Sequence, residues 1–286
     1  MPEGKPLQQK SKQKTGFHPR KSSEDIKKTP EKYVDHTLAY RYEMKYLISE
    51  SKAQALVQFI KPYLQLDRYC KLQPGWAYPI VSLYLDSDNL QLAQESLTGQ
   101  KNRFKLRIRG YTDDLDYPRF FEIKRRINNI IIKNRARVMP HDVATVLSGM
   151  SLPPQNYSTD EETLKQFQLY IKNINAQPTI LVRYMRQAFE DSSENRIRLT
   201  FDRELSYKVT KAPEIKLNSP SWQHHSYTLG RVILEIKFTA RYPAWLSRMV
   251  EFFNLGQESI SKYVTSIKQS CQLGFCAPQL QSTNHG

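Results

Sequence analysis

Ten residues, NRFKLRIRGY (102–111), alternate between cationic and apolar side chains. The cations stand at every second position: Arg103, Lys105, Arg107 and Arg109. Because successive side chains of a β-strand point to opposite faces, all four charges share one face and the apolar residues share the other. Four like charges on one face repel each other, and like charges on neighbouring strands destabilise a sheet unless an anion screens them.

The pattern recurs, with scarce carboxylates among the cations. Charged residues of shared parity are Arg41, Glu43 and Lys45; Glu122, Lys124 and Arg126; Lys133, Arg135 and Arg137; Arg196, Arg198 and Asp202; Glu235 and Lys237. For any single strand, a solvated outer face is the simplest interpretation. Repetition over six strands instead favours a sheet closed on itself with these faces inward. Such a cationic tunnel suits phosphates, which guanidinium groups bind bidentately.

Hydrophobic periodicity predicts a strand-rich domain with helices between some of the strands. Strand-like segments lie at 38–49, 78–87, 102–112, 119–128, 130–139, 179–191, 195–209 and 231–240. Helical segments lie at 49–64, 88–99, 141–150, 160–174, 243–254 and 258–270. Ser49 and Asp88 are the expected N-caps of the first two helices. The predicted fold class is α+β, an eight-stranded antiparallel β-barrel with flanking helices.

Composition divides the chain into a central domain and two tails. Residues 1–36 are polar and basic, which predicts a disordered tail, and 276–286 form a second tail around a domain at 37–275. The formal net charge of +15 indicates polyanionic partners. No apolar run approaches the ~18 residues that span a bilayer, and no secretory signal is evident. We therefore expect a cytoplasmic protein, with peripheral attachment to a membrane left open.

The carboxylates on the charged faces are candidate metal ligands. Hard divalent cations bind carboxylate oxygens and accept phosphate oxygens as their remaining ligands. Mg²⁺ or Mn²⁺ held by one or two carboxylates together with substrate phosphates fits this composition. The alternative for each carboxylate is a salt bridge to a neighbouring Arg or Lys.

Several motifs, in this order, resemble one family. RYEMKYLI, SLYLDS, FKLRIRGY, FEIKRR…IIKNRARV, VRYMRQAFE…RIRLTFD, LEIKF and SISKY are similar to the VTC domain, the polyphosphate polymerase domain of the vacuolar transporter chaperone complex. The resemblance spans roughly residues 38 to 271. It implies the fold of the triphosphate tunnel metalloenzymes, relatives of the CYTH proteins. It also implies transfer of the γ-phosphoryl of ATP onto a growing inorganic polyphosphate chain, with Mn²⁺ or Mg²⁺.

The resemblance and the charged strand faces together nominate site residues. The expected catalytic residues are Lys45, Arg107, Arg109 and Lys262. The expected phosphate-binding residues are Lys105, Lys124, Lys133, Arg186 and Arg198. The expected metal ligand is Glu235, with Glu43 and Glu122 as further candidates.

Other functions stay open at this stage. CYTH hydrolases begin with Glu-x-Glu-x-Lys, and Arg41 replaces the first glutamate here, which weakens the triphosphatase alternative. A binding module without catalysis would use the same cations. Specific nucleic-acid binding is not expected, because Phe104, Phe120 and Phe121 are predicted to face a core rather than to stack on bases. A membrane-protein partner stays possible.

Overall fold

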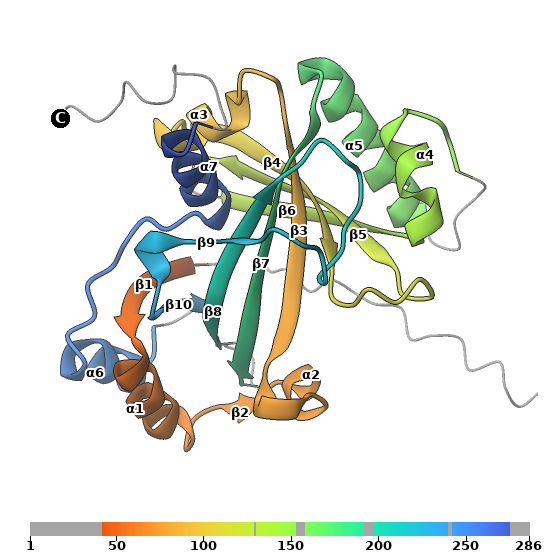
Figure 1. The fold of residues 1–286 in the computed structure, drawn as a ribbon. Helices are drawn as coiled ribbons and strands as arrows, with labels where there is room; N and C mark the ends of the chain where they lie inside the picture. The colour runs from red at the N-terminus through yellow and green to blue at the C-terminus, as the bar shows by residue number, and fades with distance from the viewer. Residues whose placement is uncertain (1–41, 129, 153–157, 192–196, 240–241, 275–286) are drawn as a thin grey trace, which may run out of the picture. The chain divides into compact units, whose positions relative to one another are not determined.

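One antiparallel sheet organises the computed structural model, which describes residues 42–128, 130–152, 158–191, 197–239 and 242–274 (Figure 1). All of them belong to one unit, Leu38–Gly286. Both predicted tails, Arg41 and the predicted hairpin loop at 192–195 lie outside the described residues. The domain limits at 37 and 275 therefore stay predictions.

The described part of the sheet has ten strands, and eight of them run in the order β1-β10-β8-β7-β3-β4-β5-β6. Their bounds are β1 Tyr42–Ser49, β3 Tyr78–Asp86, β4 Asn102–Gly110, β5 Arg119–Ile127, β6 Ile130–Val138, β7 Gln177–Glu190, β8 Arg198–Val209 and β10 Arg231–Phe238. Two short strands, β2 (Gln65–Leu66) and β9 (Gln223–His224), pair with β7 and β8. The predicted antiparallel α+β class is confirmed.

The predicted closure into an eight-stranded barrel is wrong. Within the described residues, β1 and β6 end the strand order and do not pair with each other. The sheet nevertheless curls, since β5 and β1 are far apart in the strand order and yet the Lys124 ammonium lies 3.3 Å from the Glu43 carboxylate. The strands at this opening carry charged side chains, so side chains rather than backbone hydrogen bonds make the contact across it.

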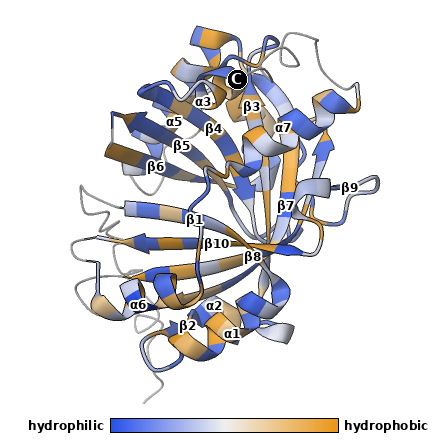
Figure 2. Cartoon of the chain, turned by 90° about the vertical axis from the view of Figure 1, so that its left-hand side faces the viewer, coloured by the Kyte–Doolittle hydropathy of each residue, from blue (hydrophilic) through white to orange (hydrophobic). Residues whose placement is uncertain are grey.

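The outer face of the sheet is apolar and covered by helices. Helices α1 (Glu50–Ile60) and α6 (Ala244–Phe252) pack on β1, β8 and β10 (Figure 2). Helices α4 (Val143–Leu147) and α5 (Ser158–Ile174) pack on β4 to β6 (Figure 1). The hydroxyl of Ser49 accepts from the N–H of Lys52, which confirms the predicted cap of α1. No helix in the described part of the chain is both long and apolar enough to span a bilayer.

Helices α3 (Gln91–Leu97) and α7 (Lys262–Gln272) meet at one end of β3, and α2 (Arg68–Lys71) lies before β3 in the chain. The predicted cap Asp88 is wrong, since the carboxylate of Asp86 accepts the N–H groups of Leu92 and Ala93 at 2.9 and 3.0 Å. The Tyr263 hydroxyl donates to the same carboxylate. Single-turn 3₁₀ helices lie at Pro74–Trp76, Pro140–Asp142 and Ser226–Thr228.

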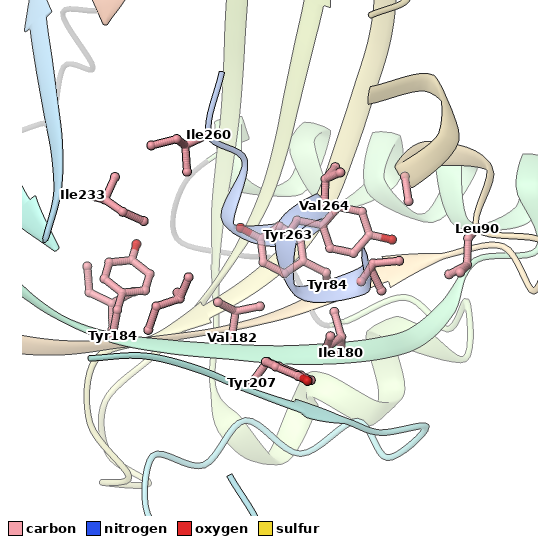
Figure 3. Close-up of a cluster of buried hydrophobic side chains, with 14 of the residues drawn as sticks. Tyr84, Leu90, Ile180, Val182, Tyr184, Tyr207, Ile233, Ile260, Tyr263 and Val264 are labelled. Carbon is pink, nitrogen blue, oxygen red and sulfur yellow. The ribbon is translucent and has the colours of Figure 1, made fainter. Parts of the chain in front are cut away.

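Helix α7 covers part of the other face of the sheet, which we call the inner face. The ring of Tyr263 stacks on Tyr84 of β3 with 4.7 Å between centroids. Ile260 and Val264 join Tyr184 in the same buried apolar cluster (Figure 3). The inner face therefore has an apolar part beneath α7, and its charged side chains are gathered beyond the N-terminus of that helix.

Candidate active site

Cations outnumber carboxylates on the charged part of the inner face. Ten Lys and Arg side chains there, which we call the cation cluster, are Lys45, Lys105, Arg107, Arg109, Lys124, Lys133, Arg135, Arg186, Lys237 and Lys262. Four carboxylates are paired with them: Glu43, Glu122, Asp202 and Glu235. The two-residue period of each strand and the antiparallel register bring these side chains together. None of the fourteen is fully exposed to solvent.

Glu122 of β5 is the most enclosed of the carboxylates. Its side chain is fully buried, with Arg107 at 2.6 Å and Lys133 at 2.9 Å. The Nε of Arg135 donates to it at 2.8 Å, and Arg109 lies at 3.9 Å. Register explains the arrangement, because Glu122 stands directly between Arg107 on β4 and Arg135 on β6. Burial acts to raise the pKa of Glu122, but the surrounding cations hold it well below its usual range.

Asp202 of β8 anchors a second group of cations. Arg186 of β7 donates to both carboxylate oxygens, from Nε and Nη2, at 2.7 Å each. Lys262, the first residue of α7, lies 2.6 Å from the same carboxylate. Burial acts to raise the pKa of Asp202, but Arg186 and Lys262 outweigh it and lower that pKa. This planar, bidentate pair fixes the orientation of the Arg186 guanidinium.

Glu43 and Glu235 form a pair of neighbouring carboxylates on β1 and β10. Lys45 lies 2.9 Å from Glu43, and Lys237 lies 2.6 Å from Glu235. Burial and the charge of Glu235 act to raise the pKa of Glu43, yet Lys124, Lys45 and Lys237 hold it at about 2. Burial likewise opposes ionisation of Glu235, whose pKa its lysine neighbours hold well below the usual range. Both groups are therefore anionic at neutral pH.

This carboxylate pair is the part of the cluster that fits a divalent metal. Across the described residues, no group of three or more His, Cys, Asp and Glu side chains converges. The chain would thus supply Glu43 and Glu235, and phosphate oxygens would supply further ligands. Glu122 fits poorly, because its side chain is fully buried among arginines and Lys133, whereas 13% of the Glu43 side chain is exposed.

Lys105 is the least compensated cation of the cluster. No carboxylate in the described part of the chain pairs with it, and its ammonium donates to the Ser261 hydroxyl at 2.8 Å. Burial first, and then the charges of Lys124 and Lys45, hold its pKa well below the usual range. In addition, the buried Nε of Arg109 has no hydrogen-bond partner among the described residues. A phosphate chain bound along β4 would give both groups a hydrogen-bond partner of opposite charge.

The segment before α7 joins this helix to the cluster. The Lys45 ammonium donates to the carbonyl of Ile260 at 2.9 Å, and the N–H of Glu258 donates to the carbonyl of Lys45 at 2.8 Å. Ser261 caps α7 by accepting from the N–H of Val264. The positive end of the helix dipole thus lies beside the ammonium groups and adds to the local attraction for anions.

The structure brings eleven of the twelve predicted site residues together. They are Lys45, Lys105, Arg107, Arg109, Lys124, Lys133, Arg186, Lys262, Glu43, Glu122 and Glu235. Arg198 stands opposite Lys237 in the register of β8 and β10, but its guanidinium pairs with Asp67 at 2.8 Å and with Glu190, outside the four carboxylates of the cluster. The chemical roles of all twelve stay predictions.

Aromatic positions on β4 and β5 were predicted only in part. Phe104 and Phe121 pack on α5 as expected, with ring centroids 4.3 Å from Tyr170 and 4.9 Å from Phe167. The prediction for Phe120 is wrong, because its parity places it on the inner face, where the Arg135 guanidinium lies 4.7 Å above its ring.

Sequence reasoning did not nominate several members of the site. Arg135 and Lys237 were visible from parity, since each lies two residues from a nominated residue on the same strand. Tyr84, whose hydroxyl accepts from Arg107 at 3.3 Å, also follows strand parity. Ser261 has no such local signal, because its partner Lys105 is 156 residues away in the chain.

Fold and site together define an antiparallel α+β protein with a half-buried cationic inner face. The family model described as VTC domain matches residues 40–271. The match covers most of the chain, and this protein belongs to the VTC domain family.

Comparisons with individual proteins add little to the family assignment. No curated protein matches this chain. A Bacillus halodurans crystal structure, described as a candidate adenylate cyclase, shares 13% identity over 78% of this chain and 94% of its own, with a TM-score of 0.43. The PH1819 protein of Pyrococcus horikoshii shares 8% identity over 80% and 99%, with a TM-score of 0.39. At these scores, the likeness carries no inference about function.

Proposed function

We propose that this protein is a polyphosphate polymerase, which transfers the γ-phosphoryl of ATP onto a growing inorganic polyphosphate chain. The carrying observation is the surplus of cations gathered on the inner face, most of them half-buried, with Lys105 lacking a carboxylate partner in the described part of the chain. Like charges at this density are stable beside a bound polyanion. The chain belongs to the VTC domain family, and the resemblance of its motifs to that family implies this reaction.

The arginines of the cluster hold the phosphates. Arg107 and Arg109 project from one strand two residues apart, so both can bind successive phosphates of an extended chain. Glu122 orients these guanidinium groups from behind, as Asp202 orients Arg186. Pre-oriented donors need no reorganisation when charge develops, which is the main source of rate enhancement in phosphoryl transfer.

The reaction needs little covalent chemistry from the chain. A terminal oxygen of the acceptor polyphosphate attacks the γ-phosphorus of ATP and forms a new P–O bond. The bond from the γ-phosphorus to the bridging oxygen breaks, and ADP leaves with the electron pair. The acceptor oxygen is already ionised, so no general base is required. Lys45, whose ammonium donates to the Ile260 carbonyl, neutralises charge on the phosphates. Lys262, which forms an ion pair with Asp202, does the same.

A divalent cation, Mn²⁺ or Mg²⁺, would be held by Glu235 and Glu43. When bound, it would supply charge neutralisation at phosphate oxygens. Lys237 and Lys45 hold both carboxylates ionised. Glu122 is left out of this metal site, because its side chain is fully buried among cations.

A product assay tests the proposal. Purified protein is incubated with ATP and Mn²⁺, and products are separated on a gel stained for polyphosphate. The polymerase makes long chains; a triphosphatase on the same site releases orthophosphate alone, and a binding module yields neither. Arg107→Ala should lose chain synthesis, whereas Arg203→Ala should keep it, because Arg203 pairs with Glu50 of α1 away from the cluster. Absence of chains with wild-type protein contradicts the proposal.

A further inference from the structure

Four aromatic rings form a row at one end of the cation cluster. They belong to Tyr69 of α2, Tyr78 at the start of β3, Tyr111 just after β4, and Phe120 of β5. Their ring centroids are 6.4, 6.2 and 5.7 Å apart in this order. Each step is within the range of edge-to-face and tilted aromatic contacts. The four rings thus form one chain of aromatic contacts, which we call the aromatic row; the guanidinium groups of Arg68 and Arg135 lie over its two end rings, Tyr69 and Phe120.

The aromatic row is joined directly to the arginines of the site. Arg135 lies 4.7 Å above the ring of Phe120 and donates to the Tyr111 hydroxyl at 3.4 Å. Phe120 stands opposite Arg109 in the register of β4 and β5. The charges of Arg109 and Arg135 also oppose the effect of burial on the pKa of Tyr111 and lower it. A ligand held by these arginines would therefore lie beside aromatic rings.

The four rings differ in exposure, and the most exposed is Tyr69, at the end of the row away from Phe120. Tyr78 is buried at 9% exposure, whereas Tyr69 is 47% exposed. Tyr111 and Phe120 are half-buried. An apolar core needs no such exposed aromatic end, and a row that opens to solvent beside a phosphate site can receive a flat ring.

We propose that the aromatic row is the subsite where the nucleobase of the nucleoside triphosphate stacks. This inference rests on the proposed function, because it requires the phosphates to lie on the adjacent arginines. Stacking uses the π-face that every base has, so it discriminates weakly between bases. The protein should accordingly bind ATP and GTP with similar affinity.

A purely structural role for the row makes a different prediction. Rings that only close this end of the inner face would support the arginines, so their loss would weaken every phosphate ligand alike. A stacking subsite affects nucleotides and leaves inorganic tripolyphosphate unchanged, since that ligand has no base. The ratio of the two affinities separates the two roles.

Calorimetric titrations without divalent metal, which prevent turnover, measure this ratio. Tyr69→Ala removes an exposed ring, and Phe120→Leu removes the π-face while keeping apolar contact. Because Tyr69 and Phe120 are the two ends of the row, one base stacks on only one of them. One of the two variants should therefore weaken ATP binding roughly 5- to 100-fold, the range for one stacked base, and both should leave tripolyphosphate binding unchanged. Tyr63→Ala, which removes a 40% exposed ring that stacks on Trp245 elsewhere, is the matched control and should change neither.

The outcomes distinguish the subsite from the function on which it rests. Unchanged ATP affinity in both variants, or equal losses for ATP and tripolyphosphate, overturns the nucleobase subsite alone. Absence of tripolyphosphate binding to the wild-type protein overturns the proposed function as well.

Discussion

Replacing Glu122 with glutamine tests the arrangement at the centre of the cation cluster. The substitution keeps the shape of the side chain but removes the negative charge that Arg107, Lys133 and Arg135 share. Glu122 is fully buried, so water cannot take over the role of the carboxylate. The cations around it would be left without their counter-ion.

The expected effect is large for a single substitution. Removing one partner of a buried ion pair lowers the free energy of unfolding by about 3–5 kcal/mol. The folded-state pKa of Glu122 is depressed, so its stabilising contribution is present above its unfolded pKa and is lost as pH falls through the folded value. The difference between wild type and Glu122→Gln should therefore be full at pH 7 and shrink in acid.

Urea unfolding at pH 7, followed by circular dichroism, measures this difference. Glu161→Gln is the matched control, because Glu161 forms an exposed pair with Lys165 at 2.7 Å on α5 and should contribute little. A loss below about 1 kcal/mol for Glu122→Gln would refute the role of Glu122 as the buried counter-ion. If the same variant kept its stability but lost its response to Mn²⁺, Glu122 would be a metal ligand instead.

Three further predictions concern activity and binding. Arg107→Ala and Arg109→Ala should each lower the rate of phosphoryl transfer by roughly 100- to 1,000-fold with the fold retained, and near-normal rates would contradict the site. Burial lowers the pKa of Lys133 to about 7, so at pH 8 phosphate binding should draw a proton onto this amine. Calorimetry in two buffers of different ionisation heat measures the total uptake. Lys133→Met should reduce it but not remove it, because the pKa values of Lys105 and Lys237 are depressed as well. Glu235→Gln should abolish metal-dependent turnover but preserve tripolyphosphate binding; loss of both would contradict its assignment to the metal.

Local periodicity predicted much of the fold and the site. The alternation in residues 102–111 assigns the two faces of β4 without tertiary information, because side-chain direction in a strand depends on parity alone. The same rule places Glu122, Lys133 and Glu235 on the inner face. Ser49 was predictable as a cap because capping acts over three residues.

Features that depend on long-range contacts were not predictable. The opening between β1 and β6 depends on strand curvature, which no single segment encodes. The Asp86 carboxylate, not Asp88, accepts N–H groups in the first turn of α3, and Leu90 before that turn has a left-handed backbone (φ +55°) that Leu rarely adopts. The contact of Ser261 with Lys105 likewise exists only once α7 lies on the inner face.

Titration of inorganic tripolyphosphate into the wild-type protein at several salt concentrations tests the central claim most directly. If the inner-face cations are balanced by a phosphate chain, binding will be saturable and will weaken steeply as salt rises. Lys105→Met should weaken it further, because this lysine has no carboxylate partner in the described part of the chain. Absence of saturable binding at low salt would contradict the account.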